Sequence, residues 1–115
     1  METILQRLLG IDGVTGALLV GKDGLVVAST LEGEDEEFLA AMAAASYDVT
    51  GRYIAQLGIG EVRHALYETA SGTVQVTDGG QVLIVVRSNT AANMGRIRME
   101  CTQASLRLSE QIGSY

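Results

Sequence analysis

Two runs of aliphatic residues constrain the fold most strongly, because neither of them has a polar face. Thr15–Val20 and Val82–Val86 are almost continuously apolar, whereas Thr73–Thr77 alternates polar and apolar side chains. A strand without a polar face is usually covered on both sides of its sheet. We therefore expect both runs to be inner strands of a sheet that carries helices on its two faces.

Short turns that contain glycine separate most of the predicted strands. Asp23-Gly24 follows the first run, Ser71-Gly72 precedes the alternating strand, and Asp78-Gly79-Gly80 leads into the last one. Asp-Gly pairs are typical of tight hairpins, and hairpins join antiparallel strands. The sheet is therefore predicted to be mainly antiparallel. Its five strands are Thr15–Val20, Leu25–Ser29, Val62–Thr69, Thr73–Thr77 and Val82–Val86.

Three further segments have the spacing of apolar residues that is typical of helices. They cover residues 2–9, about 35–57 and about 91–112. The resulting order, αββαβββα, predicts an α+β fold in which α/β/α layers form a three-layer sandwich. With 115 residues, we expect one domain over residues 1–115.

The second predicted helix has a wider apolar band than a single sheet contact requires. Its middle, residues 40–46, is rich in alanine. Small side chains allow another backbone to approach closely, and a wide band favours burial on two sides. The high helix propensity of alanine accounts for the same composition, so both interpretations stay open. The band consists of two stripes: Phe38, Met42, Ala45 and Val49, and beside them Leu39, Ala43, Ser46 and Tyr53.

Composition excludes several classes of partner. Fourteen acidic residues against eight basic ones give a net charge of −6, whereas nucleic acids and anionic membranes are bound by clustered Lys and Arg. We therefore expect no nucleic-acid or membrane partner. The acids of residues 32–37 are consistent with a solvated helix start, where they offset the helix dipole, or with a docking role.

The sequence also favours a cytoplasmic location. The single cysteine cannot form an internal disulfide, which fits a reducing compartment. The first residues lack the basic region and apolar run of a signal peptide, and no apolar run approaches the ~20 residues of a membrane span.

No motif predicts catalysis, a metal site or a cofactor. Gly16–Asp23 matches the phosphate-binding pattern GxxxxGK, but Asp23 stands where Ser or Thr should bind magnesium, and no helix follows the lysine. His64 is the only histidine, and without further ligands or a nucleophile we expect it to be packed or at an interface. Cys101 lies on the apolar stripe of the last helix, where thiols are usually inert. We therefore predict a protein that is not an enzyme.

The chain resembles the roadblock/LC7 (dynein light chain) family over essentially its whole length. Three patterns carry the resemblance: the strand, Asp-Gly turn and strand of Val14–Ser29, Asp78-Gly79-Gly80 before Val82–Arg87, and Asn93-Met-Gly-Arg-Ile-Arg98 at the start of the last helix. Glycine at position 24 permits the positive φ of a tight turn. Gly95 would be explained if the helix crossed close to the sheet. The length is similar to that of stand-alone bacterial or archaeal members, including partners of Ras-like GTPases.

The resemblance implies a homodimer, in which long second helices pair and third strands join edge to edge. Such pairing would also cover Val62–Thr69, which is otherwise an exposed edge. The interface expected from this resemblance consists of Met42, Ser46, Val49, Tyr53, Arg63, His64, Ala65 and Tyr67.

The resemblance further implies a regulator or scaffold of a small Ras-like GTPase. Partner contacts are expected at Glu36, Glu37, Asp48 and Arg52, and stimulation of hydrolysis is expected without an arginine finger from Arg52. Two other functions stay open: a structural adaptor with no effect on nucleotide turnover, and a small-ligand sensor, which would need a cavity between sheet and helices.

Overall fold

The computed structural model describes residues 2–31, 33 and 35–112, and it confirms the predicted order αββαβββα. Glu32 and Glu34 of the acidic run lie outside the described residues. The helices and strands are α1 (Glu2–Leu9), β1 (Val14–Gly21), β2 (Val26–Ser29), α2 (Glu36–Gln56), β3 (His64–Glu68), β4 (Thr73–Asp78), β5 (Val82–Ser88) and α3 (Met94–Ile112).

The five strands form one sheet in the order β2-β1-β5-β4-β3. Every pairing within it is antiparallel. The two strands without a polar face, β1 and β5, pair with each other from Val14 opposite Ser88 to Gly21 opposite Val82. The prediction that both are inner strands is therefore confirmed, and β2 and β3 form the two edges.

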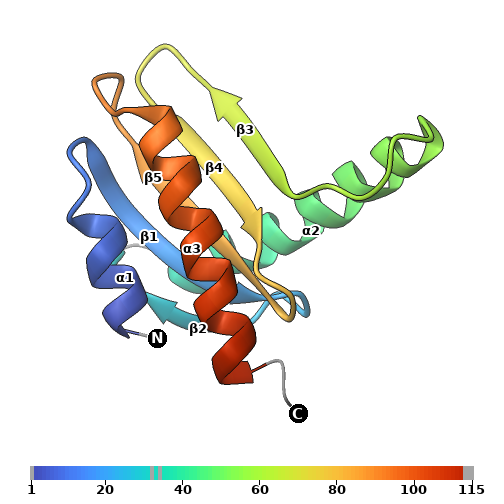
Figure 1. Ribbon diagram of the computed structural model, residues 1–115, viewed down its shortest axis with the longest axis horizontal. Coiled ribbons are helices and arrows are strands. Elements are labelled where there is room, and N and C mark those ends of the chain that lie inside the picture. Colours follow the sequence, from blue (N-terminus) through green and yellow to red (C-terminus); the bar gives the residue numbers. More distant parts are fainter. Residues whose placement is uncertain (1, 32, 34, 113–115) are drawn as a thin grey trace.

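Helices cover both faces of the sheet, as Figure 1 shows. On one face, α1 and α3 pack on a core that contains Leu5, Leu19, Ile84 and Leu108. On the other face, α2 packs through Ala40 on a smaller core with Leu18, Val20 and Leu83. Adjacent residues of β1 thus serve opposite faces, which explains why the strand is apolar throughout.

The predicted Asp-Gly turn connects β1 and β2. Gly24 has a φ of +91°, and its N–H donates to the carbonyl of Gly21 at 2.8 Å. The Asp23 carboxylate accepts a hydrogen bond from the N–H of Leu25 at 3.1 Å. Lys22 therefore leads into a hairpin and not into a helix, as the sequence predicted.

Local signals fix both ends of α2. The Asp35 side chain caps the first turn by accepting a hydrogen bond from the N–H of Phe38 at 3.2 Å. The helix ends at Gln56, and Gly58 and Gly60 follow with φ of +72° and +100°. Glycine adopts such angles without strain, so the predicted exit at these glycines is confirmed.

Two details differ from the sequence-based expectation. β3 begins at His64 and not at Val62, which shortens the predicted edge strand. A methyl group built on Gly95 would meet only the Asn93 side chain, 3.4 Å away, so the expectation that α3 crosses close to the sheet at Gly95 is wrong. No helix in the described part of the chain is long and apolar enough to cross a membrane.

Candidate interaction surface

The helix α2 leaves most of its apolar side chains in solvent. Of its 21 residues, only Ala40 is buried. A surface helix that belongs to a complete core normally buries a whole stripe of its residues. The large apolar residues that are exposed on this helix are Phe38, Leu39, Met42, Val49 and Tyr53.

The exposed stripe lies opposite the side that faces the sheet. Ala40, Ala44 and Tyr47 pack against the core of that face. Val49 and Tyr53 are 65% and 64% exposed. The predicted interface residues Met42, Ser46, Val49 and Tyr53 therefore all lie exposed on α2.

The C-terminal half of α2 extends beyond the sheet (Figure 1). The apolar surface continues into the loop that follows, where Leu57 is 55% exposed and Ile59 is 73% exposed. The glycines on either side of Ile59 let the chain reverse direction towards β3. The helix and the strand after it are thus parts of one continuous surface.

The strand β3 contributes a free edge to this surface. Among the strands of the described residues, it pairs with β4 alone. Tyr67 is 44% exposed, and its hydroxyl lies 3.4 Å from that of Thr50 on α2. Ala65 is half-buried and Arg63 is exposed, so the strand residues predicted for the interface also border this edge.

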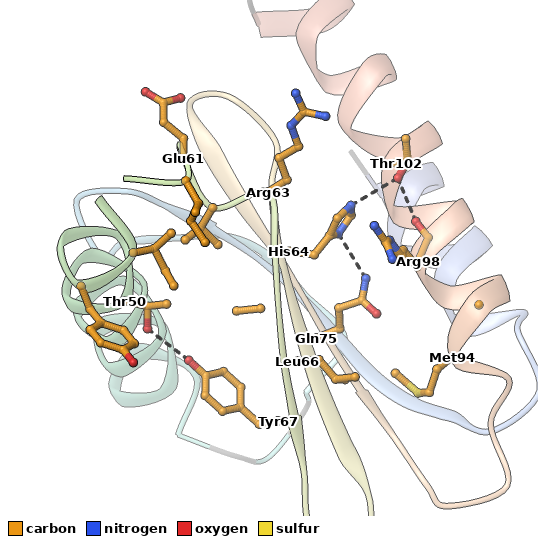
Figure 2. Close-up of a pocket in the computed structure, with 16 residues that line it drawn as sticks. Thr50, Glu61, Arg63, His64, Leu66, Tyr67, Gln75, Met94, Arg98 and Thr102 are labelled. Carbon is orange, nitrogen blue, oxygen red and sulfur yellow. Dashed lines mark hydrogen bonds between the residues drawn. The ribbon is translucent and has the colours of Figure 1, made fainter. Parts of the chain in front are cut away.

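An open groove runs along the edge of β3, between α2 and the N-terminal half of α3 (Figure 2). Its volume is about 1070 Å³, and both helices and the loop before β3 contribute to its lining. The groove lies at the sheet edge, whereas a small-ligand sensor would need a cavity between sheet and helices.

His64 points from β3 towards α3 (Figure 2). Its Nδ1 lies 2.9 Å from the hydroxyl of Thr77, and its Nε2 lies 3.5 Å from that of Thr102. Burial and the positive charges of Arg98 and Arg63 lower the pKa of His64 below its ordinary value of 6.5. In a single copy, these surroundings therefore favour the neutral form of the His64 imidazole.

A second polar cluster fastens α2 to the sheet. The Tyr47 hydroxyl donates to the Asp78 carboxylate, and that hydroxyl also lies 2.8 Å from the Val62 carbonyl. Lys22 forms an ion pair with Asp78 at 3.0 Å and lies over the Tyr47 ring. Burial, the hydrogen bond to Asp78 and nearby negative charge raise the pKa of Tyr47 well above its usual range, so the phenol stays protonated.

The residues predicted to contact a GTPase are spread along α2, from its first turn to Arg52 near its C-terminal end. Glu37, Asp48 and Arg52 are exposed, and Glu36 is half-buried. Arg52 forms an ion pair with Asp48 at 3.1 Å, one helical turn away. Exposed pairs of this kind contribute little to stability, and both side chains remain more than half exposed.

The cysteine and the lysine that were considered for chemistry are buried or paired in the fold. Cys101 is buried, and burial raises the pKa of its thiol to about 11, with the negative charge of Glu100 adding to this effect. Lys22, from the pattern that resembles a phosphate-binding loop, is paired with Asp78. Within the described ranges, no group of three or more His, Cys, Asp or Glu residues is placed to hold a metal ion.

Some members of this surface were not predicted from the sequence. Leu57 and Ile59 lie in a loop, where periodicity gives no signal. Leu66, 47% exposed, and Glu68 belong to the predicted strand. They alternate with Ala65 and Tyr67, and neighbouring strand residues point to opposite faces. This alternation could have placed Leu66 and Glu68 together on the other face of the strand.

Comparisons with known proteins agree with this architecture. A family model described as Roadblock/LC7 domain matches residues 1–88. An uncharacterised protein of Methanocaldococcus jannaschii is 34% identical over 106 residues, which are 91% of this chain and 93% of that protein.

Two solved structures have nearly the same fold. A roadblock/LC7 domain from Streptomyces avermitilis has a TM-score of 0.90 and 21% identity, with 97% of each chain covered. Myxococcus xanthus MglB has a TM-score of 0.91 and 23% identity, with 98% of this chain and 94% of that chain covered.

Proposed function

Because the chain belongs to the Roadblock/LC7 domain family, we propose that it acts as a homodimer that regulates or scaffolds a small Ras-like GTPase in the cytoplasm. In this proposal the chain has no catalytic, metal or cofactor site of its own. It acts through protein–protein contacts, and α2 and β3 provide them.

The observation that carries the proposal is the exposure of α2. Large exposed apolar patches mark interaction sites on soluble proteins, and a free sheet edge favours pairing with another strand. A second copy related by two-fold symmetry would cover both features at once, because such an interface uses the same patch twice. The apolar stripe of α2 would pack on its equivalent while the two β3 edges meet.

The GTPase half of the proposal is supported by the family and by the charges of α2. The proposed contacts are Glu37, Asp48 and Arg52, with Glu36 at their border. They lie beside the apolar stripe and not within it, so dimerisation would leave a charged rim for a second protein. Interfaces commonly combine an apolar centre with such a rim.

Sedimentation velocity tests the dimer. Between 1 and 100 μM chain, we expect the protein to sediment with twice the mass of 12.1 kDa. A folded species that keeps the mass of one chain at 100 μM would contradict the proposal.

Hydrolysis measurements test the GTPase role. The probe is the Ras-like GTPase encoded nearest to the gene of this protein, loaded with GDP or with a GTP analogue. We expect saturable binding that prefers one nucleotide state, together with faster GTP hydrolysis. Binding without any change in turnover would instead support the structural adaptor, and absence of binding in both states would contradict the role for that GTPase.

A further inference from the structure

The open edge of β3 has a defined set of unpaired backbone groups. Arg63 accepts a hydrogen bond from the N–H of Asp78, and the N–H of Thr69 donates to Gly72. In an antiparallel pair, hydrogen-bonded residues alternate with residues whose backbone groups point away. With the register of β3 against β4, the backbone groups of His64, Leu66 and Glu68 therefore point to the open edge.

These three residues also share one face of the sheet. His64 lies against Thr77 and Thr102, and this is the face covered by α3 (Figure 2). Leu66 and Glu68 follow at alternate positions and so have the same orientation. The strand thus presents, in order, a base, an exposed leucine and an acid along its free edge.

Two-fold pairing of this edge with a second copy has few possible registers. Outward backbone groups must meet outward groups, so His64, Leu66 and Glu68 can only lie opposite one another. Pairing centred on Leu66 aligns all five residues of the strand, and it places His64 opposite the partner's Glu68. Shifting the centre by one residue either way places His64 or Glu68 opposite leucine and shortens the overlap.

His64 lies in a basic corner of the groove, next to Arg98 and Arg63, and the groove lining also includes the acid Glu61. Arg98 of α3 and Arg63 of the same strand are the charged groups that act on it, while β4 contributes the neutral Gln75 and Thr77 and α3 the neutral Thr102. Within residues 2–31, 33 and 35–112, the ion pairs join Lys22 to Asp78 and Arg52 to Asp48. A basic corner of this kind is notable in a chain of net charge −6.

We propose that the second copy completes this corner: the partner's Glu68 lies opposite His64 and Arg98, and the two symmetric contacts fix the register of the β3–β3 junction. This inference rests on the homodimer proposed above and adds the residue that each copy contributes to the other. Opposite charges across strands stabilise a sheet, and like charges destabilise it. The partner's Leu66 meets Leu66 at the two-fold axis.

Two charge variants test this pairing. Each should dimerise more weakly on its own, and a mixture of the two should form heterodimers. Glu68→Lys places a second base opposite each His64, and His64→Glu places a second carboxylate opposite each Glu68. Each variant alone is expected to dimerise about three- to thirtyfold more weakly than the wild type in 50 mM salt. In a mixture, one contact is native and the other joins the introduced carboxylate of one variant to the introduced ammonium of the other. Heterodimers should therefore form with close to wild-type affinity.

Glu110→Lys is the matched control, since Glu110 is an exposed carboxylate on α3. It makes the same change of charge away from β3 and should leave the dissociation constant within twofold of the wild type. Recovery of association in the mixture also shows that both charge variants fold. A wild-type dimer whose two variants do not recover on mixing would overturn the register pair but not the dimer. A wild type that is monomeric would overturn both.

The pairing also predicts how association depends on pH. The partner's carboxylate favours protonated His64, so the dimer binds more protons than two separate chains do. Because the pKa of His64 in the separate chain lies below 6.5, dimerisation should therefore tighten as the pH falls from about 7 to about 5. Glu68→Gln should remove this dependence, whereas Glu110→Gln should keep it. A pH dependence that survives Glu68→Gln would contradict the contact with His64.

Discussion

At the scale of single residues, Tyr47 is the clearest link between α2 and the sheet. Its hydroxyl contacts both Asp78 and the Val62 carbonyl at 2.8 Å. Tyr47→Phe keeps the ring but removes the hydroxyl, whose single proton lies within reach of both acceptors. We expect the free energy of unfolding to fall by about 1–2 kcal/mol, as measured by urea denaturation.

Tyr53→Phe provides the comparison for this substitution. Tyr53 is on the same helix and is 64% exposed, so removing its hydroxyl should change the free energy of unfolding by less than about 0.5 kcal/mol. Equal losses in the two variants would mean that the contacts of Tyr47 have no special role in stability.

The surroundings of Asp78 allow a prediction of how the free energy of unfolding changes at acidic pH. Burial alone would raise the pKa of this carboxyl, but hydrogen bonds from Gly80, Lys22 and Tyr47 outweigh it and hold the pKa below the ordinary value of 3.8. The unfolded chain then binds the proton more readily than the folded chain, so the stabilisation is present above pH ~4 and is lost as the pH falls through the folded-state pKa.

The free energy of unfolding, measured at several pH values below neutrality, tests this direction. Asp78→Asn should be less stable than the wild type at pH 7, and the difference should shrink as the pH falls from 5 to 2. A constant difference over this range would contradict a lowered pKa for Asp78. Asp48→Asn, at an exposed ion pair, should show little difference at either end of the range.

Cys101 allows a prediction about reactivity. The thiolate is the reactive form of cysteine, and Cys101 is buried with its pKa raised to about 11. At pH 8 the native protein should therefore react with a thiol reagent such as DTNB at least a hundredfold more slowly than the protein in 6 M guanidinium chloride. Comparable rates in the two conditions would show that the last helix does not shield this residue.

At the scale of elements, the sequence predicted the features that short stretches of chain determine: strands, turns and helix ends. The hydrophobic runs located β1 and β5, Gly24 located the turn between β1 and β2, and Gly58 marked the end of α2. The side of α2 that faces the sheet was not predicted, because its alanine-rich apolar band is too wide to mark one stripe. Tyr47 was missed for a related reason: its partner Asp78 is 31 residues away, and no local pattern links the two.

The exposed apolar stripe of α2 gives a prediction about dimerisation. Val49 is 65% exposed, so Val49→Glu should leave the fold of one chain intact. In the proposed dimer, the same change buries two carboxylates in an apolar interface, which is costly. We expect a folded monomer at 10 μM by sedimentation, with an unchanged far-ultraviolet circular dichroism spectrum.

Leu106→Glu is the control for this change. Leu106 is a similarly exposed aliphatic residue, 56% accessible, but it lies on α3 away from the proposed interface. This variant should remain dimeric. If both variants dissociated, a general effect of added charge would explain the result better than a contact at Val49.

At the scale of the whole molecule, the fold is divided unevenly between its two faces. The face under α1 and α3 has the larger core, while the face under α2 has the smaller one. Much of the apolar surface that α2 brings to the fold therefore remains to be covered. A chain of this design gains stability from association, and the gain must depend on protein concentration.

The melting temperature measures how stability depends on protein concentration. If the second copy completes the fold, a tenfold rise in protein concentration adds about 1.4 kcal/mol to the stability of the dimer, which corresponds to roughly 3 °C for two chains of this size. We expect this slope between 1 and 100 μM for the wild type and for Leu106→Glu, but not for Val49→Glu. A wild-type melting temperature that does not change with concentration would mean that α2 is stable with its apolar stripe in water.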